Sequence, residues 1–98
     1  MAMVFMEPAE REGIKTRLAM HILDNVVPRI MNDGIFIGDR IALAYTWYRF
    51  LCKHSASRCP DVPKNIAEWS LEDLRKIADA LIEFAQQLIE GALQKKSL

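Results

Sequence analysis

The stretch AEWSLEDLRKIADALIEFAQQLIEGAL, residues 67–93, decides the fold class of this chain. When its residues are placed at about 100° intervals around a helix, apolar and charged side chains separate onto opposite faces. A ridge of leucines spaced by seven residues runs beside a ridge of alanines, and such a surface lets a second helix approach closely. The pattern therefore predicts a long amphipathic helix packed against at least one other helix. The two ridges consist of Leu74, Leu81 and Leu88, and of Ala78, Ala85 and Ala92.

The start of this helix carries its own signals. Ser70 can accept a hydrogen bond from the backbone N–H of Asp73, and the Asp73 carboxylate can reach back to Ser70, as in a capping box. Trp69 and Leu74 stand at the two positions of a hydrophobic staple. We therefore expect a helix over residues 70–95.

Two further helices are predicted upstream. Residues 8–31 form the first, which ends at the Asn-Asp-Gly turn signal and contains Pro28, expected to kink or weaken its last turn. Residues 37–54 form the second, because their apolar pattern is too long and too irregular for an alternating strand. The segment 55–69 is then the one long loop. We expect an all-α fold, with three main helices in an antiparallel bundle, in a single domain of residues 1–98.

Composition limits the classes of function. The chain has 98 residues, with thirteen basic and thirteen acidic side chains, so no overall charge favours nucleic acid or an anionic membrane. The longest apolar stretch, residues 35–52, is interrupted by charged residues and is a poor membrane span. The N-terminal residues lack the features of a signal peptide. We expect no membrane association and a cytoplasmic location.

The apolar surface exceeds what three helices in one layer can bury. Residues 37–54 are apolar over more than half of the helix circumference, and Ile14 and Leu18 lie nearly opposite the main apolar face of the first helix. Large exposed apolar patches usually mark interfaces, so we predict a homo-oligomer, a dimer or tetramer, most simply a two-fold dimer. The alternatives are a different protein partner, or large aromatics that simply lie half exposed. The residues predicted to form the self-association interface are Tyr45, Trp47, Tyr48, Leu74, Leu81, Ala85 and Leu88.

The sequence lacks the motifs of common catalytic and cofactor sites, including GxGxxG, the phosphate-binding loop, HExxH and CxxC. Cys52, His54 and Cys59 are all zinc-ligand types, but their spacing matches no closed zinc pattern. We expect both cysteines to stay reduced, as in a reducing compartment. Cys52, on the apolar face of its helix, should act as a small hydrophobe. His21 is a candidate general base that is better interpreted as a surface residue. We therefore assign no catalytic, cofactor-binding or metal-ligating residue.

A stripe of carboxylates follows the polar face of the last predicted helix: Glu72, Asp79, Glu83 and Glu90. In size, helical content and predicted oligomerisation, the chain resembles the all-α nucleotide pyrophosphatases, in which carboxylates of two neighbouring helices hold magnesium. The motifs of that family are ExxE and ExxD, whereas this chain has ExxE only at Glu7 and Glu10 and has no ExxD. The resemblance implies a pyrophosphohydrolase-like enzyme whose magnesium site is missing or atypical. The helix geometry instead favours a solvated acidic face.

The middle third of the chain is basic. Arg49 and Lys53 are one helical turn apart, and Tyr45 is one turn before Arg49, so this strip could contact anions such as phosphates. The alternative is ion pairing with the acidic last helix, within the subunit or across an interface, which the zero net charge favours. We expect a small non-catalytic helical interaction or assembly module that self-associates. The alternatives are the pyrophosphatase-like enzyme and a nucleic-acid-associated subunit that uses the basic helix.

Overall fold

The computed structural model describes residues 8–97, with side chains described for residues 13–91, and these residues form helices with no strand. The predicted all-α class is confirmed. The second and third predicted helices agree with α3 and α4 to within two residues, and the first, residues 8–31, is divided into α1, η1 and α2. The long helices are α1 (Pro8–His21), α3 (Ile37–His54) and α4 (Leu71–Ser97), joined by the π-helical segment η1 (Ile22–Val26), by α2 (Val27–Ile30) and by the 3-10 turns η2 (Ala56–Arg58) and η3 (Ile66–Glu68).

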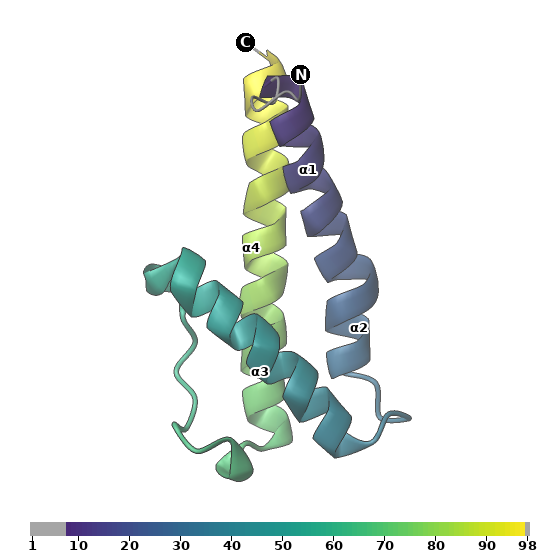
Figure 1. Ribbon diagram of the computed structural model, residues 1–98, viewed down its shortest axis with the longest axis vertical. Helices are drawn as coiled ribbons and strands as arrows, with labels where there is room; N and C mark the ends of the chain where they lie inside the picture. The colour runs from purple at the N-terminus through teal and green to yellow at the C-terminus, as the bar shows by residue number, and fades with distance from the viewer. Residues whose placement is uncertain (1–7, 98) are drawn as a thin grey trace, which may run out of the picture.

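The helices form an elongated arrangement rather than three aligned rods. α1, η1 and α2 run as one continuous column beside α4 and in the opposite direction, whereas α3 crosses the lower half of α4 at a steep angle (Figure 1). The Cα radius of gyration is 15.4 Å, and a compact chain of this length would have about 12.6 Å. The paired ends of α1 and α4 extend beyond α3 and account for this shape (Figure 1).

The π-helical segment resolves the conflict that Pro28 creates in the first helix. The N–H of Val27 donates to the carbonyl of Ile22, five residues earlier, instead of the usual four. Pro28 has no N–H, and in a regular α-helix its ring collides with the carbonyl of Asp24. The wider turn immediately before Pro28 leaves room for that carbonyl. The helix therefore continues to Ile30 without a break.

The same wide turn changes which residues of the first helix face the core. A π-type turn inserts one extra residue, which rotates the following side chains by about 100°. Leu18 consequently packs against the same core as Ile22 and Val26. The prediction that Leu18 lies on the opposite side is wrong because it assumed a regular α-helix throughout. Ile14 remains exposed, at 47%.

The start of α4 has the predicted capping box. The Asp73 carboxylate accepts from the backbone N–H of Ser70 at 2.8 Å and from its hydroxyl at 3.1 Å. The Ser70 hydroxyl in turn accepts from the backbone N–H of Asp73 at 3.4 Å. Trp69 and Leu74, the staple positions, are both buried in the core. Local sequence signals thus fix the point at which the chain enters α4.

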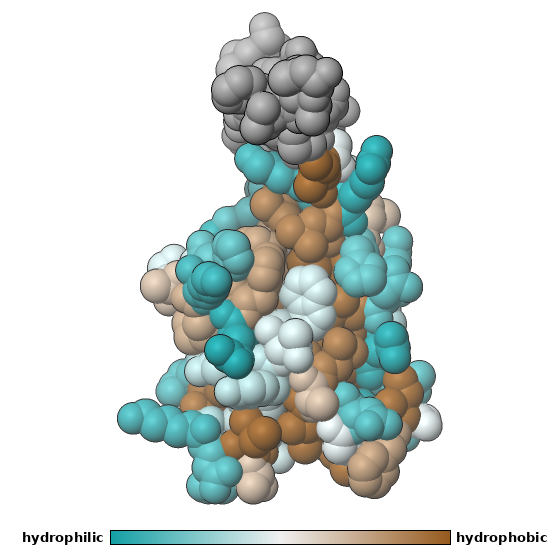
Figure 2. All heavy atoms as spheres, viewed as in Figure 1, coloured by the Kyte–Doolittle hydropathy of each residue, from teal (hydrophilic) through white to brown (hydrophobic). Residues whose placement is uncertain are grey.

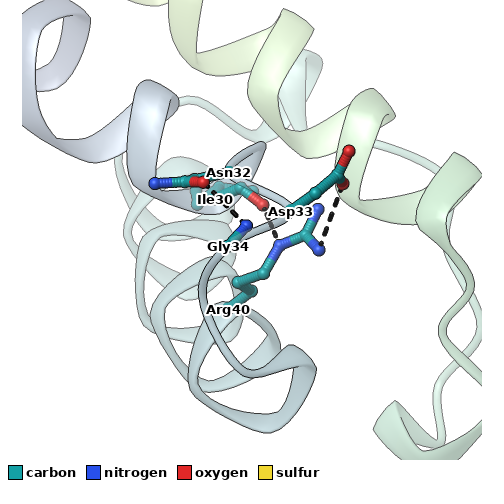
Figure 3. A network of polar contacts seen from close by, with 5 residues as sticks. All are labelled: Ile30, Asn32, Asp33, Gly34 and Arg40. Atoms are coloured by element: carbon teal, nitrogen blue, oxygen red, sulfur yellow. Dashed lines mark hydrogen bonds and ion pairs between the residues drawn. The ribbon is translucent and has the colours of Figure 1, made fainter.

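A buried arginine closes the turn between α2 and α3. Arg40 is only 5% exposed, and its Nε donates to the carbonyl of Ile30 at 2.8 Å. This bond satisfies a carbonyl at the end of α2 that has no helical partner. The exposed Asp33 lies 3.6 Å from the Arg40 guanidinium, and the side chain of Asn32 accepts from the N–H of Gly34 (Figure 3). Arg40 is therefore a structural residue and no part of an open basic surface.

Candidate functional site at the end of α3

A disulfide joins the last turn of α3 to the loop that follows it. Cys52 and Cys59 are bonded, with their Cα atoms 4.5 Å apart. The expectation of two reduced cysteines is therefore wrong in this structure. The reason is local: α3 ends at His54, and the turn η2 brings the chain back toward α3, so a separation of seven residues becomes a short distance. That expectation assumed a reducing compartment, and disulfides persist mainly in oxidising ones.

His54, the candidate zinc ligand, and His21, the candidate general base, do not lie in a metal or catalytic site of the described residues. Among the described residues, no group of three or more histidine, cysteine or acidic side chains could hold a metal ion. His54 packs against the ring of Phe50, with ring centroids 4.4 Å apart. His21 is exposed, and its ring lies 3.4 Å from the amide nitrogen of Asn25. No nucleophile is placed beside either histidine in the described contacts.

An open groove of about 630 Å³ lies along the C-terminal half of α3, beside the disulfide. Its described lining carries three side chains that can be cationic, Arg49, Lys53 and His54, and no carboxylate. We call it the basic groove. The structure thus brings the two predicted anion-contact residues, Arg49 and Lys53, into one concave surface together with both cysteines. The other lining residues are Tyr45, Thr46, Tyr48 and Phe50.

Aromatic packing holds the inner wall of the basic groove in place. The rings of Tyr45 and Tyr48 lie 6.0 Å and 5.6 Å from the ring of Trp69. Trp69 itself is fixed by a hydrogen bond from its indole N–H to the carbonyl of Pro63, at 2.8 Å. The guanidinium of Arg49 lies over the Tyr45 ring, 5.8 Å from its centroid, within reach of a cation–π attraction. The segment after the disulfide, through Pro63 and Trp69, therefore holds the aromatic wall of the basic groove in place.

A second, smaller hollow lies on the other side of Cys59, between the loop and α4. Arg58 crosses it, pairing with the Glu83 carboxylate at 3.2 Å and donating to the side-chain oxygen of Gln87. Within the described residues, this is the one ion pair between the basic middle third and the acidic face of α4. The predicted pairing of these two charged regions inside the subunit therefore applies to Arg58, whereas Arg49 and Lys53 have no ion pair there.

The predicted interface residues divide into two groups. Leu74, Leu81 and Ala85 are fully buried between α4 and the other helices of the same chain. They stabilise the fold of the single chain and are not available to a second copy. Their assignment to an interface failed because the sequence pattern cannot separate packing within the chain from packing between chains. Four residues keep part of their surface exposed while packing against the core: Tyr45, Trp47, Tyr48 and Leu88.

The carboxylates of the last helix do not converge. Glu72, Asp79 and Glu90 are exposed on the outer face of α4, and Glu83 meets Arg58 rather than another carboxylate. The ExxE motif at Glu7 and Glu10 lies outside the residues whose side chains are described. The described part of the chain thus contains no carboxylate cluster of the kind that the pyrophosphatase resemblance implies.

Comparisons with known proteins give no relative for this chain. No protein-family model matches it, and neither the curated proteins nor the solved structures contain a match. No helix of the described residues is long and apolar enough to cross a membrane. The surface of the molecule is therefore what indicates its function.

Sequence reasoning missed one surface that the structure makes evident. Among the described side chains, seven large hydrophobic residues are exposed, and five of them come from the segments at the lower end of the molecule (Figure 1). We call these five the apolar end. Brown side chains are visible at this end of the space-filling view (Figure 2). Their signal in the sequence was weak, because they flank the helices instead of forming a stripe along one. The apolar end consists of Met31, Phe36, Ile37, Ile66 and Leu71.

Proposed function

We propose that this protein is a small non-catalytic helical module that self-associates, and that the apolar end is the surface through which it does so. The observation that carries the proposal is the exposure of Phe36 and Leu71, at 72% and 56%. Scattered exposed hydrophobic residues are normal on a protein surface, but their concentration at one end is typical of an interaction site.

Phe36 has the features of an interface anchor. A Cβ atom added at Gly38 would lie 2.6 Å from a ring atom of Phe36, so the ring rests directly on the backbone at the start of α3. A large side chain that is already held in one position loses little conformational entropy when a partner covers it. Complete burial of a Phe or Leu side chain contributes about 1.5–3 kcal/mol. Two such anchors, used twice in a two-fold dimer, supply a substantial part of the free energy of association.

Light scattering over a range of concentrations tests the proposal. We expect a mass that corresponds to a dimer or tetramer. The variant combining Phe36→Ser with Leu71→Ser should shift this mass toward the monomer without changing the helical circular dichroism. Ile14→Ser is the matched control, because Ile14 is 47% exposed on α1 and lies outside the apolar end. A wild-type protein that stays a folded monomer at every concentration would overturn the proposal.

The two alternatives from the sequence stay predictions, and each has a distinct signature. A pyrophosphatase-like enzyme predicts that magnesium raises the melting temperature. A nucleic-acid-associated subunit predicts salt-sensitive binding that weakens when Arg49 and Lys53 are replaced by Ala. The self-associating module predicts neither effect, so the same purified protein distinguishes the three.

A further inference from the structure

We propose that the Cys52–Cys59 disulfide is a thiol–disulfide exchange site that reacts preferentially with thiols carrying net negative charge. Two features support this: the unequal exposure of the two cysteine residues, and the absence of carboxylates from the described lining of the basic groove. The contacts of the disulfide ring with α4 give reduction a structural consequence. The inference does not depend on the proposed self-association.

The exposure of the two cysteines determines which sulfur is attacked. Cys59 is exposed and lies between the basic groove and the hollow on its other side, whereas Cys52 is half-buried on α3. Exchange needs a thiolate that approaches an accessible sulfur while the other sulfur leaves. The incoming thiolate therefore attacks the Sγ of Cys59, and Cys52 is the leaving group.

The charges of the basic groove favour both reacting species. Arg49 and Lys53 line the groove and have no ion pair among the described residues, so their charges are available to attract an anionic thiol. The same charges stabilise the thiolate that forms on Cys52. The carbonyls at the C-terminus of α3 oppose this with about half a negative charge, which is less than the two positive charges. Beyond Cys59, the Glu83 carboxylate is already paired with Arg58.

The exchange balances in two steps. In the first, the attacking thiolate forms a bond to the Cys59 sulfur, the Cys52–Cys59 bond breaks, and the Cys52 thiolate takes a proton from water. In the second, another thiolate attacks the sulfur of the small molecule in this mixed disulfide. It releases the oxidised small-molecule disulfide and leaves Cys59 as a thiolate. Two thiols have then supplied the two electrons that reduce the protein.

Reduction has a structural consequence beyond the cysteines themselves. The disulfide closes a ring that contains Arg58, and Arg58 is the residue of that ring that contacts Glu83 and Gln87 on α4. When the disulfide opens, Arg58 is no longer held beside α4. Cys59, which lines the basic groove, can then move away from α3. The exchange site therefore couples the redox state of the cysteines to the shape of the groove.

Reaction rates with three small thiols test the proposal. The probes are glutathione, which is anionic, 2-mercaptoethanol, which is neutral, and cysteamine, which is cationic. After normalisation to the thiolate fraction of each and to its rate with a neutral model disulfide, we expect glutathione to react about tenfold faster than cysteamine at low salt. High salt should remove this preference. The variant combining Arg49→Gln with Lys53→Gln should also remove it, whereas Arg29→Gln, which changes an exposed cation outside the groove, should retain it.

The position of the trapped intermediate is the second readout. Excess glutathione followed by alkylation and peptide mapping should place the glutathione on Cys59 and the alkyl group on Cys52. Equal normalised rates for the three thiols would overturn the proposal, as would a preference that survives in the Arg49 and Lys53 variant. Glutathione found mainly on Cys52 would also overturn it, because the argument from exposure would then be wrong.

Discussion

Removal of the Cys52–Cys59 disulfide should lower the free energy of unfolding by about 2.4 kcal/mol. The figure follows from the sequence separation of seven residues. Closing a loop of that size removes about 7.9 cal/mol/K from the unfolded ensemble, which is about 2.4 kcal/mol at 25 °C. In the folded state the change should be confined to the disulfide ring and to the contact of Arg58 with Glu83, an exposed ion pair that contributes little to stability. The variant to compare with wild type combines Cys52→Ala with Cys59→Ser.

The assay is urea unfolding followed by circular dichroism at one fixed protein concentration, since self-association would otherwise change the apparent stability. The free energy of unfolding of the wild type should fall by the same amount when a reductant is added. That of the variant should not change. A loss below about 0.5 kcal/mol in both experiments would refute the reasoning, since the crosslink would then not restrict the unfolded chain as the loop-closure relation requires.

Four further substitutions, and Leu71→Ala as a control, test the packing and the caps by the same urea unfolding assay. Leu81→Ala should lower the free energy of unfolding by about 2–5 kcal/mol, because Leu81 is fully buried, whereas Leu71→Ala, at an exposed position, should cost far less. Ser70→Ala should cost about 1 kcal/mol through loss of the cap at the start of α4. Arg40→Met should cost about 1–3 kcal/mol, since the carbonyl of Ile30 would lose its donor. Ala85→Glu should abolish the cooperative transition, because it places a charge in the core, and a stable folded variant would contradict the observed burial.

The elements that could be predicted from the sequence are those specified by neighbouring residues. The start of α4 depends on Ser70 and Asp73, three residues apart, and its core face depends on regular spacing along one helix. Both signals are local, so the helix and its cap follow from the sequence alone. The crossing of α3 over α4 depends on contacts between distant segments, and no local pattern specifies it.

The expectations that the structure corrects have physical causes that regular spacing along the chain does not show. Leu18 was misplaced because Pro28 induces a wider turn several residues away from it. The excess of basic residues in the middle third includes Arg40, yet Arg40 is buried and donates to the carbonyl of Ile30, ten residues earlier. The disulfide was not expected because the two cysteines were assigned to a reducing compartment, whereas the turn after α3 brings them together. For Arg40 a contact between separated residues overrides the local pattern, whereas for Leu18 and the two cysteines the path of the backbone does.

Phe36 of the apolar end and the exchange site lie at opposite ends of α3, and this separation leads to a further prediction. α3 has 18 residues, and at 1.5 Å per residue its length is about 27 Å. Phe36 precedes its first residue, whereas Cys52 lies in its last turn. Contacts through the apolar end should therefore survive reduction of the disulfide, provided that the chain remains folded. Light scattering of the reduced protein, below its melting temperature, should give the same mass as the oxidised protein. A change of mass on reduction would mean that the disulfide ring takes part in the contact between copies, and the interface would then have to be placed at the C-terminal end of α3 instead.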